Sequence, residues 1–441
     1  MIKEYETKNE NNNDKNISIP FINNNLSTLN NEKSSKNERE LNYSFDNTNI
    51  NNNIYPTRTR SKRSNTVSIF KSEESMNNRM FIFILTYNLG GVNINEINNI
   101  EFLNILFPKD TKYYFSNISY PTFYCIALQE VVELNTFNIL FKSNKDIIDA
   151  WEEKITNILQ ARHNYILEVK ENLVGILFLV YVKATECKFI TKKNIQTVKK
   201  GFFGQTGNKG YIIYNFSYKN ANFGFCAGHL LSGEKEKEYK QRKLDLIEIL
   251  NNTSNKGTKF YKNDFYFVFG DLNFRVKNEK LIELHDWSKK LNLKKQKNDN
   301  ENNNINDNDQ IYIIKDQDIN SEKFEEFMKN EQLRIFLGQL QRFNITEGYI
   351  NFLPTFRYFV GTNDYDIFKR HISWTDRILF KKNKNIEQIK YNRENVNFSD
   401  HKPVYSLFSI NLNEKDYEET KTIKMDDGDE WEDIGYINFD D

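Results

Sequence analysis

The feature that constrains the fold most is a series of short apolar runs between Met80 and Ile410, each with the length and composition of a β-strand. Helical periodicity is confined to three stretches, 145–160, 236–251 and 322–340. Several runs follow one another closely enough to form hairpins, which favours two packed sheets with helices outside them. The predicted strands are residues 80–88, 123–130, 175–183, 211–218, 222–230, 265–274, 377–380 and 404–410.

Length, charge and cysteine content narrow the class of protein. The 441 residues fit one large enzyme domain with tails, and the 35 Phe and 24 Tyr allow a substantial core. A formal net charge of zero argues against a nucleic-acid-binding protein that relies on bulk positive charge. The three cysteines, Cys125, Cys187 and Cys226, suit neither a disulfide scaffold nor a structural zinc site.

The sequence also bears on the compartment. The first residues lack the charged and apolar pattern of a signal peptide. The longest apolar run, residues 173–182, has about half the length that a membrane span needs. We therefore expect a cytoplasmic protein in a reducing environment.

Composition predicts a central domain with two tails. Residues 1–75 are dominated by Asn, Ser, Lys and Glu and are predicted to be disordered. Residues 76–412 form the predicted ordered domain, which carries a disordered Asn-rich insert at about 294–310. Residues 413–441 form a predicted acidic tail. The basic cluster 57–63 is consistent with a solvated charge run or with a membrane or partner contact.

Polar residues that a buried strand does not explain occur where the predicted strands end. Polar groups at the rim of a rigid scaffold are a common way to build a site. Each motif alone is weak evidence, because Asp or Asn beside Gly usually only makes a turn and an isolated His is usually structural. It is the combination in order that indicates a site: Asn88, Glu130, His229, Asp271 with Asn273, Asp376 with Arg377, and Asp400 with His401.

The residue types suit phosphate chemistry with a hard metal ion. Oxygen donors from Asn88, Glu130 and either Asp271 or Asp400 favour Mg²⁺. His and Asp side chains can position water and stabilise charge on a phosphoryl group. These features predict a Mg²⁺-dependent enzyme that hydrolyses phosphate esters. Basic residues in or near the same motifs are candidates for holding several phosphates: Lys209, Arg275, Arg357, Arg370, Arg377 and Lys402.

Eight motifs follow one another over about residues 81–410: TYNLGG, ALQE, GQTGNKG, GHLLSGEKEKEYKQRKLD, GDLNFR, PTFRY, SWTDRIL and SDHKPV. Their combination resembles the inositol polyphosphate 5-phosphatases, which belong to the DNase I-like superfamily of endonucleases, exonucleases and phosphatases. The Gly-Asn-Lys-Gly loop, the Trp-x-Asp-Arg-Ile-Leu motif and the Lys-Pro-Val after His401 are much narrower than the superfamily pattern.

The resemblance implies an α+β fold, a four-layer α/β/β/α sandwich of two mainly antiparallel sheets flanked by helices. It also implies removal of the 5-phosphate from phosphoinositides, such as phosphatidylinositol 4,5-bisphosphate or 3,4,5-trisphosphate, or from soluble inositol polyphosphates. The expected partners are this substrate and a membrane surface contacted peripherally, without nucleic acid. The expected cofactor is Mg²⁺.

Carried over motif by motif, the resemblance implies a role for each candidate residue. Asp271 would orient or deprotonate the attacking water, and the Asp376–His401 pair would act beside the scissile phosphate. The other implied catalytic residues, which contact this phosphate, are Asn273 and His229. The implied metal ligands are Glu130 and Asn88, supported by Asp400. The implied substrate contacts are Asn208, Lys209, Arg275, Arg357, Arg370, Arg377 and Lys402.

The chain departs from this family where the neighbouring 4-phosphate is gripped. Many members have Tyr-Lys where this chain has Phe356-Arg357, and Lys where it has Phe368. We expect Arg357, Arg370 and the adjacent Lys369 to provide that recognition, chiefly through the guanidinium of Arg357.

Two other functions compete with this prediction. A nuclease of the same superfamily would share the metal and the His-Asp chemistry, but the narrow motifs and the neutral charge argue against it. A catalytically weak phosphoinositide-binding protein would not need the catalytic positions, which are all present.

Overall fold

The computed structural model describes residues 79–117, 119–132, 144–173, 175–200, 209–255, 257–277, 322–366 and 370–412. The predicted tails and the predicted insert at 294–310 lie outside these residues. So do three individual positions singled out from the sequence, Asn208, Phe368 and Lys369.

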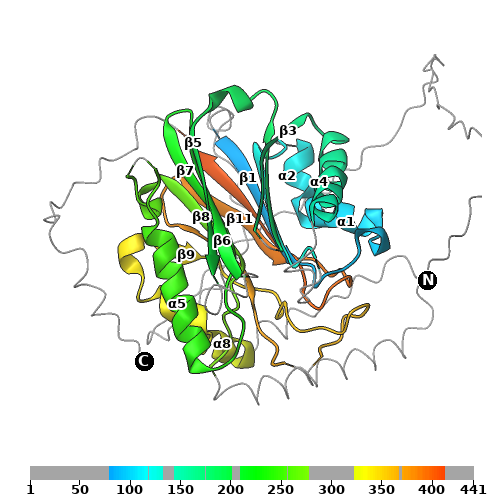
Figure 1. Ribbon diagram of the computed structural model, residues 1–441, viewed down its shortest axis with the longest axis vertical. Coiled ribbons are helices and arrows are strands. Elements are labelled where there is room, and N and C mark those ends of the chain that lie inside the picture. Colours follow the sequence, from blue (N-terminus) through cyan, green and yellow to red (C-terminus); the bar gives the residue numbers. More distant parts are fainter. Residues whose placement is uncertain are drawn as a thin grey trace, which may run out of the picture. The chain divides into compact units, whose positions relative to one another are not determined.

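Two six-stranded sheets form the centre of the described part (Figure 1). The first has the order β11-β12-β1-β2-β4-β3 and the second the order β5-β6-β7-β8-β10-β9. In each sheet one neighbouring pair is parallel, β1 with β2 and β7 with β8, and the other pairs are antiparallel. The strands of the first sheet are β1 (Arg79–Asn88), β2 (Phe123–Gln129), β3 (Tyr165–Leu173), β4 (Ile176–Lys183), β11 (Ile386–Arg393) and β12 (Val404–Asn411). Those of the second are β5 (Ile190–Lys200), β6 (Lys209–Tyr218), β7 (Ala221–His229), β8 (Phe265–Asp271), β9 (Ile345–Glu347) and β10 (Asp376–Lys381).

Helices cover the outer faces of both sheets. In Figure 1, α1, α2 and α4 lie on one side of the sheets, and α5 and α8 lie on the other. The predicted four-layer α/β/β/α sandwich of mainly antiparallel sheets is therefore confirmed. The helices are α1 (Asn99–Leu106), α2 (Lys112–Asn117), α4 (Lys145–Gln160), α5 (Glu236–Asn251), α8 (Glu322–Lys329) and α9 (Gln332–Leu337). Short 3-10 turns occur at Ile94–Glu96, Lys109–Thr111, Cys187–Phe189, Phe260–Lys262 and Gln341–Phe343.

Burial on both faces explains why the central strands are continuously apolar. In β1, Ile82 and Ile84 belong to the core between the sheets, whereas Phe83 and Leu85 belong to the core under α1 and α4. A third core lies under α5 and α9. The amphipathic pattern of residues 145–160 is confirmed, since α4 buries Ile148, Trp151, Ile155 and Leu159 along one face. Among the described helices, none is long and apolar enough to cross a membrane.

Four strands were not predicted from the sequence: β3, β5, β9 and β11. In β5 most side chains are exposed or partly exposed, because it is the edge strand of its sheet and only one neighbour pairs with it. The helical stretch at 322–340 is also divided. The first helix, α8, ends at Lys329, and Glu331 caps α9 by accepting a hydrogen bond from the backbone N–H of Arg334 at 2.8 Å.

Candidate active site

The site begins where the two parallel strand pairs end. Asn88 at the end of β1 is in register with Gln129 at the end of β2. His229 at the end of β7 is in register with Asp271 at the end of β8. The antiparallel strand β10 starts at Asp376, opposite Asp271. Ends of parallel strands meet at one edge of a sheet, so residues from distant segments converge here.

Asp271 lies at the centre of this group and is buried. Its carboxylate accepts hydrogen bonds from the side-chain amide of Asn88 at 2.9 Å and from the backbone N–H of Asn273 at 3.2 Å. The preceding residue must be glycine, because a Cβ on Gly270 would stand 1.9 Å from the carbonyl oxygen of Gly228. The Gly-Asp-x-Asn motif thus reflects close strand packing as well as chemistry.

The electrostatic surroundings keep Asp271 ionised. Burial acts to raise the pKa of its carboxyl group, but a hydrogen bond from His229 and the positive charges of His401, His229 and Lys209 hold that pKa well below its usual range. Asp271 is therefore a hydrogen-bond acceptor at neutral pH, which suits a group that orients water.

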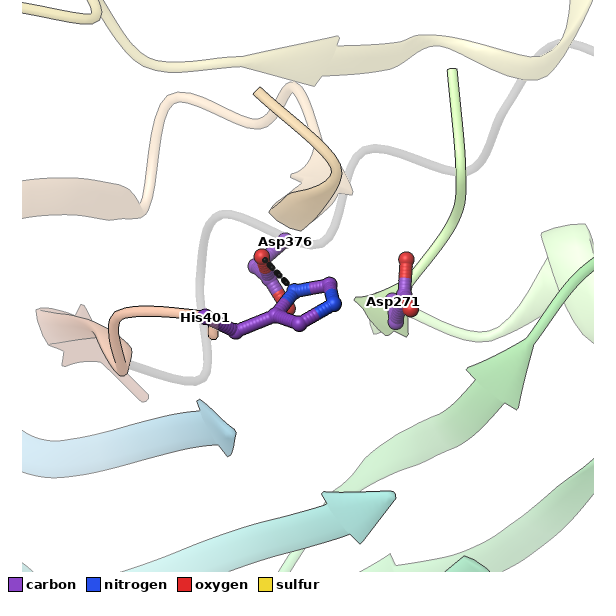
Figure 2. A group of neighbouring side chains, drawn as sticks. All are labelled: Asp271, Asp376 and His401. Carbon is purple, nitrogen blue, oxygen red and sulfur yellow. Dashed lines mark hydrogen bonds and ion pairs between the residues drawn. The ribbon is translucent and has the colours of Figure 1, made fainter. Parts of the chain in front are cut away.

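His401 is held by Asp376 and faces Asp271 (Figure 2). Its Nδ1 lies 2.9 Å from Asp376 Oδ2, which also accepts hydrogen bonds from the hydroxyls of Thr355 at 2.7 Å and Thr375 at 2.9 Å. Burial acts to lower the pKa of His401, but Asp376, and further off Asp271 and Asp400, raise it to about 9. The imidazole is accordingly charged at neutral pH, with Nε2 left to donate to an anion.

Lys209 and His229 form a second polar pair next to Asp271. The ammonium of Lys209 contacts His229 Nε2, and the same Nε2 lies 3.3 Å from Asp271 Oδ2. Nε2 accepts from Lys209 only when it is unprotonated, and donates to Asp271 only when it carries a proton. Burial first, and then the charge of Lys209, lower the pKa of His229, whereas the hydrogen bond to Asp271 and the charges of Asp271 and Glu130 act in the opposite direction.

The oxygen donors of Glu130 and Asn88 fit the predicted Mg²⁺ site. The carboxylate of Glu130 is partly exposed, and Oε1 lies 3.7 Å from His229 Nε2 and 3.9 Å from Lys209 Nζ, both longer than hydrogen bonds. Asn88 Oδ1 accepts one hydrogen bond, from the backbone N–H of Gly90 at 3.0 Å, which leaves a second lone pair. One carboxylate, one amide oxygen and the nearby Asp271 are a donor set suited to a hard cation.

A second group of possible metal ligands fits less well. Ligand atoms of Asp271, Asp376 and His401 all lie within 4.8 Å of one another. The raised pKa of His401 keeps its ring protonated, and a protonated imidazole cannot bind a metal ion. Asp400, predicted to support the metal, instead pairs with Arg357 Nη1 at 2.6 Å.

Arg275 provides a buried positive charge with unused donors. Its Nη2 donates to Asn273 Oδ1 at 2.7 Å, whereas Nε and Nη1 have no hydrogen-bond partner among the described residues. Its guanidinium lies over the ring of Phe356, 4.8 Å from the centroid. The Phe356 ring in turn contacts the His401 ring, with centroids 4.4 Å apart and the two planes tilted by 34°. Within the described residues, this arrangement leaves an incompletely satisfied cation beside the Asp376–His401 pair, as expected for an anion contact.

Arg377 is not a substrate contact, which corrects the sequence-based prediction. Its side chain is fully buried, and its guanidinium pairs with Glu331 at 2.9 Å and with both carboxylate oxygens of Glu347. With two carboxylates and the carbonyl of Trp374 around it, this guanidinium has no free edge for a phosphate. Its role is to join β10 to β9 and to the start of α9.

Lys402 is also structural rather than a phosphate ligand, which corrects a second prediction. Its buried ammonium donates to the Val396 carbonyl at 2.7 Å, to Asn397 Oδ1 at 2.6 Å and to Asn363 Oδ1 at 2.8 Å. These bonds use the three donors of an ammonium group, so none is left for substrate.

Arg357 and Arg370 differ in how far their charges are neutralised by neighbouring groups. Arg357 pairs with Asp366 at 3.0 Å as well as with Asp400, which argues against the prediction that its guanidinium is the main reader of a neighbouring phosphate. Arg370 is exposed, and its charge acts with burial, which has the larger effect, to lower the pKa of Arg275. Asn208, the remaining predicted contact, lies outside the described residues.

Several residues of the site were missed from the sequence. Thr355 and Thr375 orient Asp376, and both lie inside motifs that were already noticed, PTFRY and SWTDRIL. Glu234 was missed because it belongs to a charged stretch. It accepts from the His371 backbone N–H at 3.1 Å and pairs with His371 Nδ1 at 2.8 Å, next to Arg370.

The fold and the site together define a class of protein. The sequence profile of the Endonuclease/Exonuclease/phosphatase family 2 matches residues 85–407, nearly the whole described part. The chain belongs to this family.

Individual relatives narrow the resemblance. The chain is 27% identical to human synaptojanin-1 over 333 residues, which are 68% of this chain and 19% of that protein. It is 28% identical to the Saccharomyces cerevisiae polyphosphatidylinositol phosphatase INP53, over 76% of this chain and 27% of that protein. It is 26% identical to the Arabidopsis thaliana type I inositol polyphosphate 5-phosphatase 8, over 77% and 73%. The chain thus spans about a fifth to a quarter of the length of the first two.

Solved structures with the same fold differ in what they bind. The inositol polyphosphate 5-phosphatase domain of SPsynaptojanin, in complex with inositol (1,4)-bisphosphate and calcium ion, matches 75% of this chain and 84% of its own, with a TM-score of 0.56 and 22% identity. A Cimex nitrophorin in a ferrous NO complex matches 76% and 99%, with a TM-score of 0.51 and 17% identity. The fold alone therefore does not define the reaction, and the argument rests on the site.

Proposed function

We propose that this protein is a Mg²⁺-dependent phosphatase that removes the 5-phosphate of inositol phosphates, either soluble or carried on phosphoinositide lipids. The observation that carries the proposal is the charged His401, held by Asp376 and facing the ionised Asp271. The named relatives, two of them inositol polyphosphate or phosphatidylinositol phosphatases, support the substrate class.

The reaction follows from the charges of the side chains. Asp271 accepts a hydrogen bond from water and directs its oxygen at phosphorus, taking up a proton of this water as the new bond forms. The bond from phosphorus to the ring oxygen breaks, and the ring oxygen leaves as a hydroxyl after it takes a proton from solvent. His401 donates from Nε2 to the phosphoryl group and stabilises the charge that develops on it. Lys209 and Asn273 lie beside Asp271 and stabilise the same charge.

Glu130 and Asn88 would hold the metal ion. When bound there, Mg²⁺ would supply Lewis-acid stabilisation of phosphate oxygens. The lowered pKa of Lys209, caused first by burial, means that its ammonium form depends on the charges of Asp271 and Glu130 nearby. The negative charge of a bound phosphate would add to that stabilisation and favour the ammonium form of Lys209. The ammonium group would in turn favour binding of the phosphate.

A second phosphate on the ring would be bound by Arg275 together with Arg370. Arg275 has two buried donors without a partner among the described residues, while Arg357 is neutralised by Asp366 and Asp400. Charge-assisted bonds from a desolvated guanidinium contribute roughly 1.5–3 kcal/mol each. Arg275 is thus better placed than Arg357 to favour substrates with a neighbouring phosphate.

A phosphate-release assay tests the function. The protein should release phosphate from inositol 1,4,5-trisphosphate in Mg²⁺, but neither in excess chelator nor from inositol 1,4-bisphosphate. Asp271→Ala and His401→Ala should each lower turnover by about a hundredfold or more, because they remove the water-orienting and charge-stabilising groups. Cleavage of DNA at a comparable rate would instead identify a nuclease, and binding without turnover would identify a phosphoinositide-binding protein. Such an enzyme would work in the cytoplasm, at membrane surfaces when its substrate is a lipid.

A further inference from the structure

A closed hairpin, residues 357–366, stands beside the site. Its two sides are joined by a backbone hydrogen bond from Asp366 N–H to the Arg357 carbonyl at 3.0 Å. Tyr358 and Tyr365 face each other across it with ring centroids 4.4 Å apart and hydroxyls 2.8 Å apart. Both tyrosines are buried, so the base of the hairpin is packed against the rest of the domain.

The tip of the 357–366 hairpin is apolar and exposed. Phe359 N–H donates to the Asp364 carbonyl at 2.9 Å, and Gly361 turns the chain with a φ of +83°. Phe359 is 41% exposed and Val360 is 64% exposed. Exposed apolar residues are common one by one, but two adjacent ones on an ordered turn need a reason.

Buried polar groups fix this tip in place. The ammonium of Lys402 holds Asn363, and Gly361 N–H donates to the Asn397 carbonyl at 2.8 Å. At the base, Tyr358 N–H donates to the carbonyl of Asp400, the residue before His401, at 2.9 Å. The hairpin is therefore tied directly to the catalytic segment, and two cations first assigned to phosphate binding, Lys402 and Arg357, stabilise it instead.

We propose that the tip of the 357–366 hairpin inserts Phe359 and Val360 into the interfacial region of a lipid bilayer, and so holds the site against a membrane-borne substrate. The proposal rests on the proposed function and adds a membrane contact to it. A rigid tip loses little conformational entropy on insertion, which favours binding by few side chains.

The size and chemistry of the tip favour a bilayer over a protein partner. Two partly exposed side chains offer far less than the roughly 800 Å² that each partner buries in a typical protein interface. The residues that follow them, Thr362, Asn363 and Asp364, carry no positive charge. Insertion should therefore depend on apolar contact rather than on anionic lipid, and it should persist with neutral lipids and at high salt.

The test compares the full-length protein with its Phe359→Ser/Val360→Ser double variant. Vesicle flotation uses phosphatidylcholine alone, and kinetics use phosphatidylcholine vesicles with phosphatidylinositol 4,5-bisphosphate and, separately, soluble inositol 1,4,5-trisphosphate. The double variant should lose about tenfold or more in flotation and in kcat/KM on vesicles, with soluble kcat/KM unchanged. Leu244→Ser on α5 is the matched control, because Leu244 is apolar and 43% exposed, and it should change neither.

Each other outcome counts against the proposal. Equal flotation of wild type and double variant would overturn it, as would a wild type that does not float with phosphatidylcholine. An equal loss on soluble substrate would show that the tip acts on the site itself, and an equal loss in Leu244→Ser would show that any apolar surface suffices. If the wild type hydrolyses neither substrate, the proposed function fails, while flotation still decides the membrane contact.

Discussion

Asp376→Asn should change the pH at which the enzyme loses activity. The substitution keeps the shape of the side chain and removes the charge that holds His401 protonated. His401 has a pKa of about 9, against an ordinary value of about 6.5, so its surroundings favour the charged form by about 3 kcal/mol. Because burial acts in the opposite direction, loss of the Asp376 charge should return the pKa to about 6.5 or below.

The size of the kinetic effect follows from protonation. A group with raised pKa is fully charged below its ordinary value and loses its charge as pH rises through the value in the folded protein. At pH 7.5 the wild-type imidazole is therefore almost fully charged, whereas about a tenth of it would be charged in the variant. We expect kcat/KM to fall about tenfold at pH 7.5, and much less at pH about 5.5, where both proteins carry the proton.

The assay is kcat/KM on soluble inositol 1,4,5-trisphosphate from pH 5 to 10. The alkaline limb of the pH profile should lie near pH 9 in the wild type and about two and a half units lower in Asp376→Asn. Thr355→Val is the matched control, since it removes a hydrogen bond to Asp376 but no charge, and its limb should barely move. A limb at the same pH in both proteins, or a loss in Asp376→Asn that is equal at every pH, would refute the assignment of charge to His401. Melting temperatures confirm that each variant folds.

Two further predictions concern the metal and the fold. Glu130→Gln should raise the Mg²⁺ concentration needed for half-maximal turnover several-fold, because an amide keeps the shape of the side chain but loses the charge that a hard cation prefers. An unchanged Mg²⁺ titration would show that Glu130 is not a metal ligand. Arg377→Met should lower the free energy of unfolding by roughly 3–5 kcal/mol, because it leaves the buried carboxylates of Glu331 and Glu347 without a counter-charge. The measurement is a urea titration, and the control is Arg79→Met, which removes a more exposed pair with Glu387 and should cost at most about 1 kcal/mol. Equal losses in the two variants would contradict the structural role of Arg377.

The sequence by itself determined the architecture and most of the group at the centre of the site. Strands buried on both faces, such as β1 and β8, appear as unbroken apolar runs, and each ends in a polar residue that burial does not explain. The edge strands β5 and β11 were missed because exposed and polar positions dilute their pattern. The motifs then identified Asp271, Asp376 and His401, which the structure brings together.

Tertiary structure alone decided which cations face an anion and which are already neutralised. Four of the motifs each contain one basic residue that looks equivalent to the others in the sequence: Arg275, Arg357, Arg377 and Lys402. In the folded chain, Arg377 is enclosed by carboxylates 30 and 46 residues away, and Lys402 is enclosed by oxygen atoms of two loops. A buried cation needs partners that satisfy its donors, and those partners come from segments whose proximity only the fold sets. Arg275 is left with two buried donor nitrogens, because none of the described segments brings an acceptor to them.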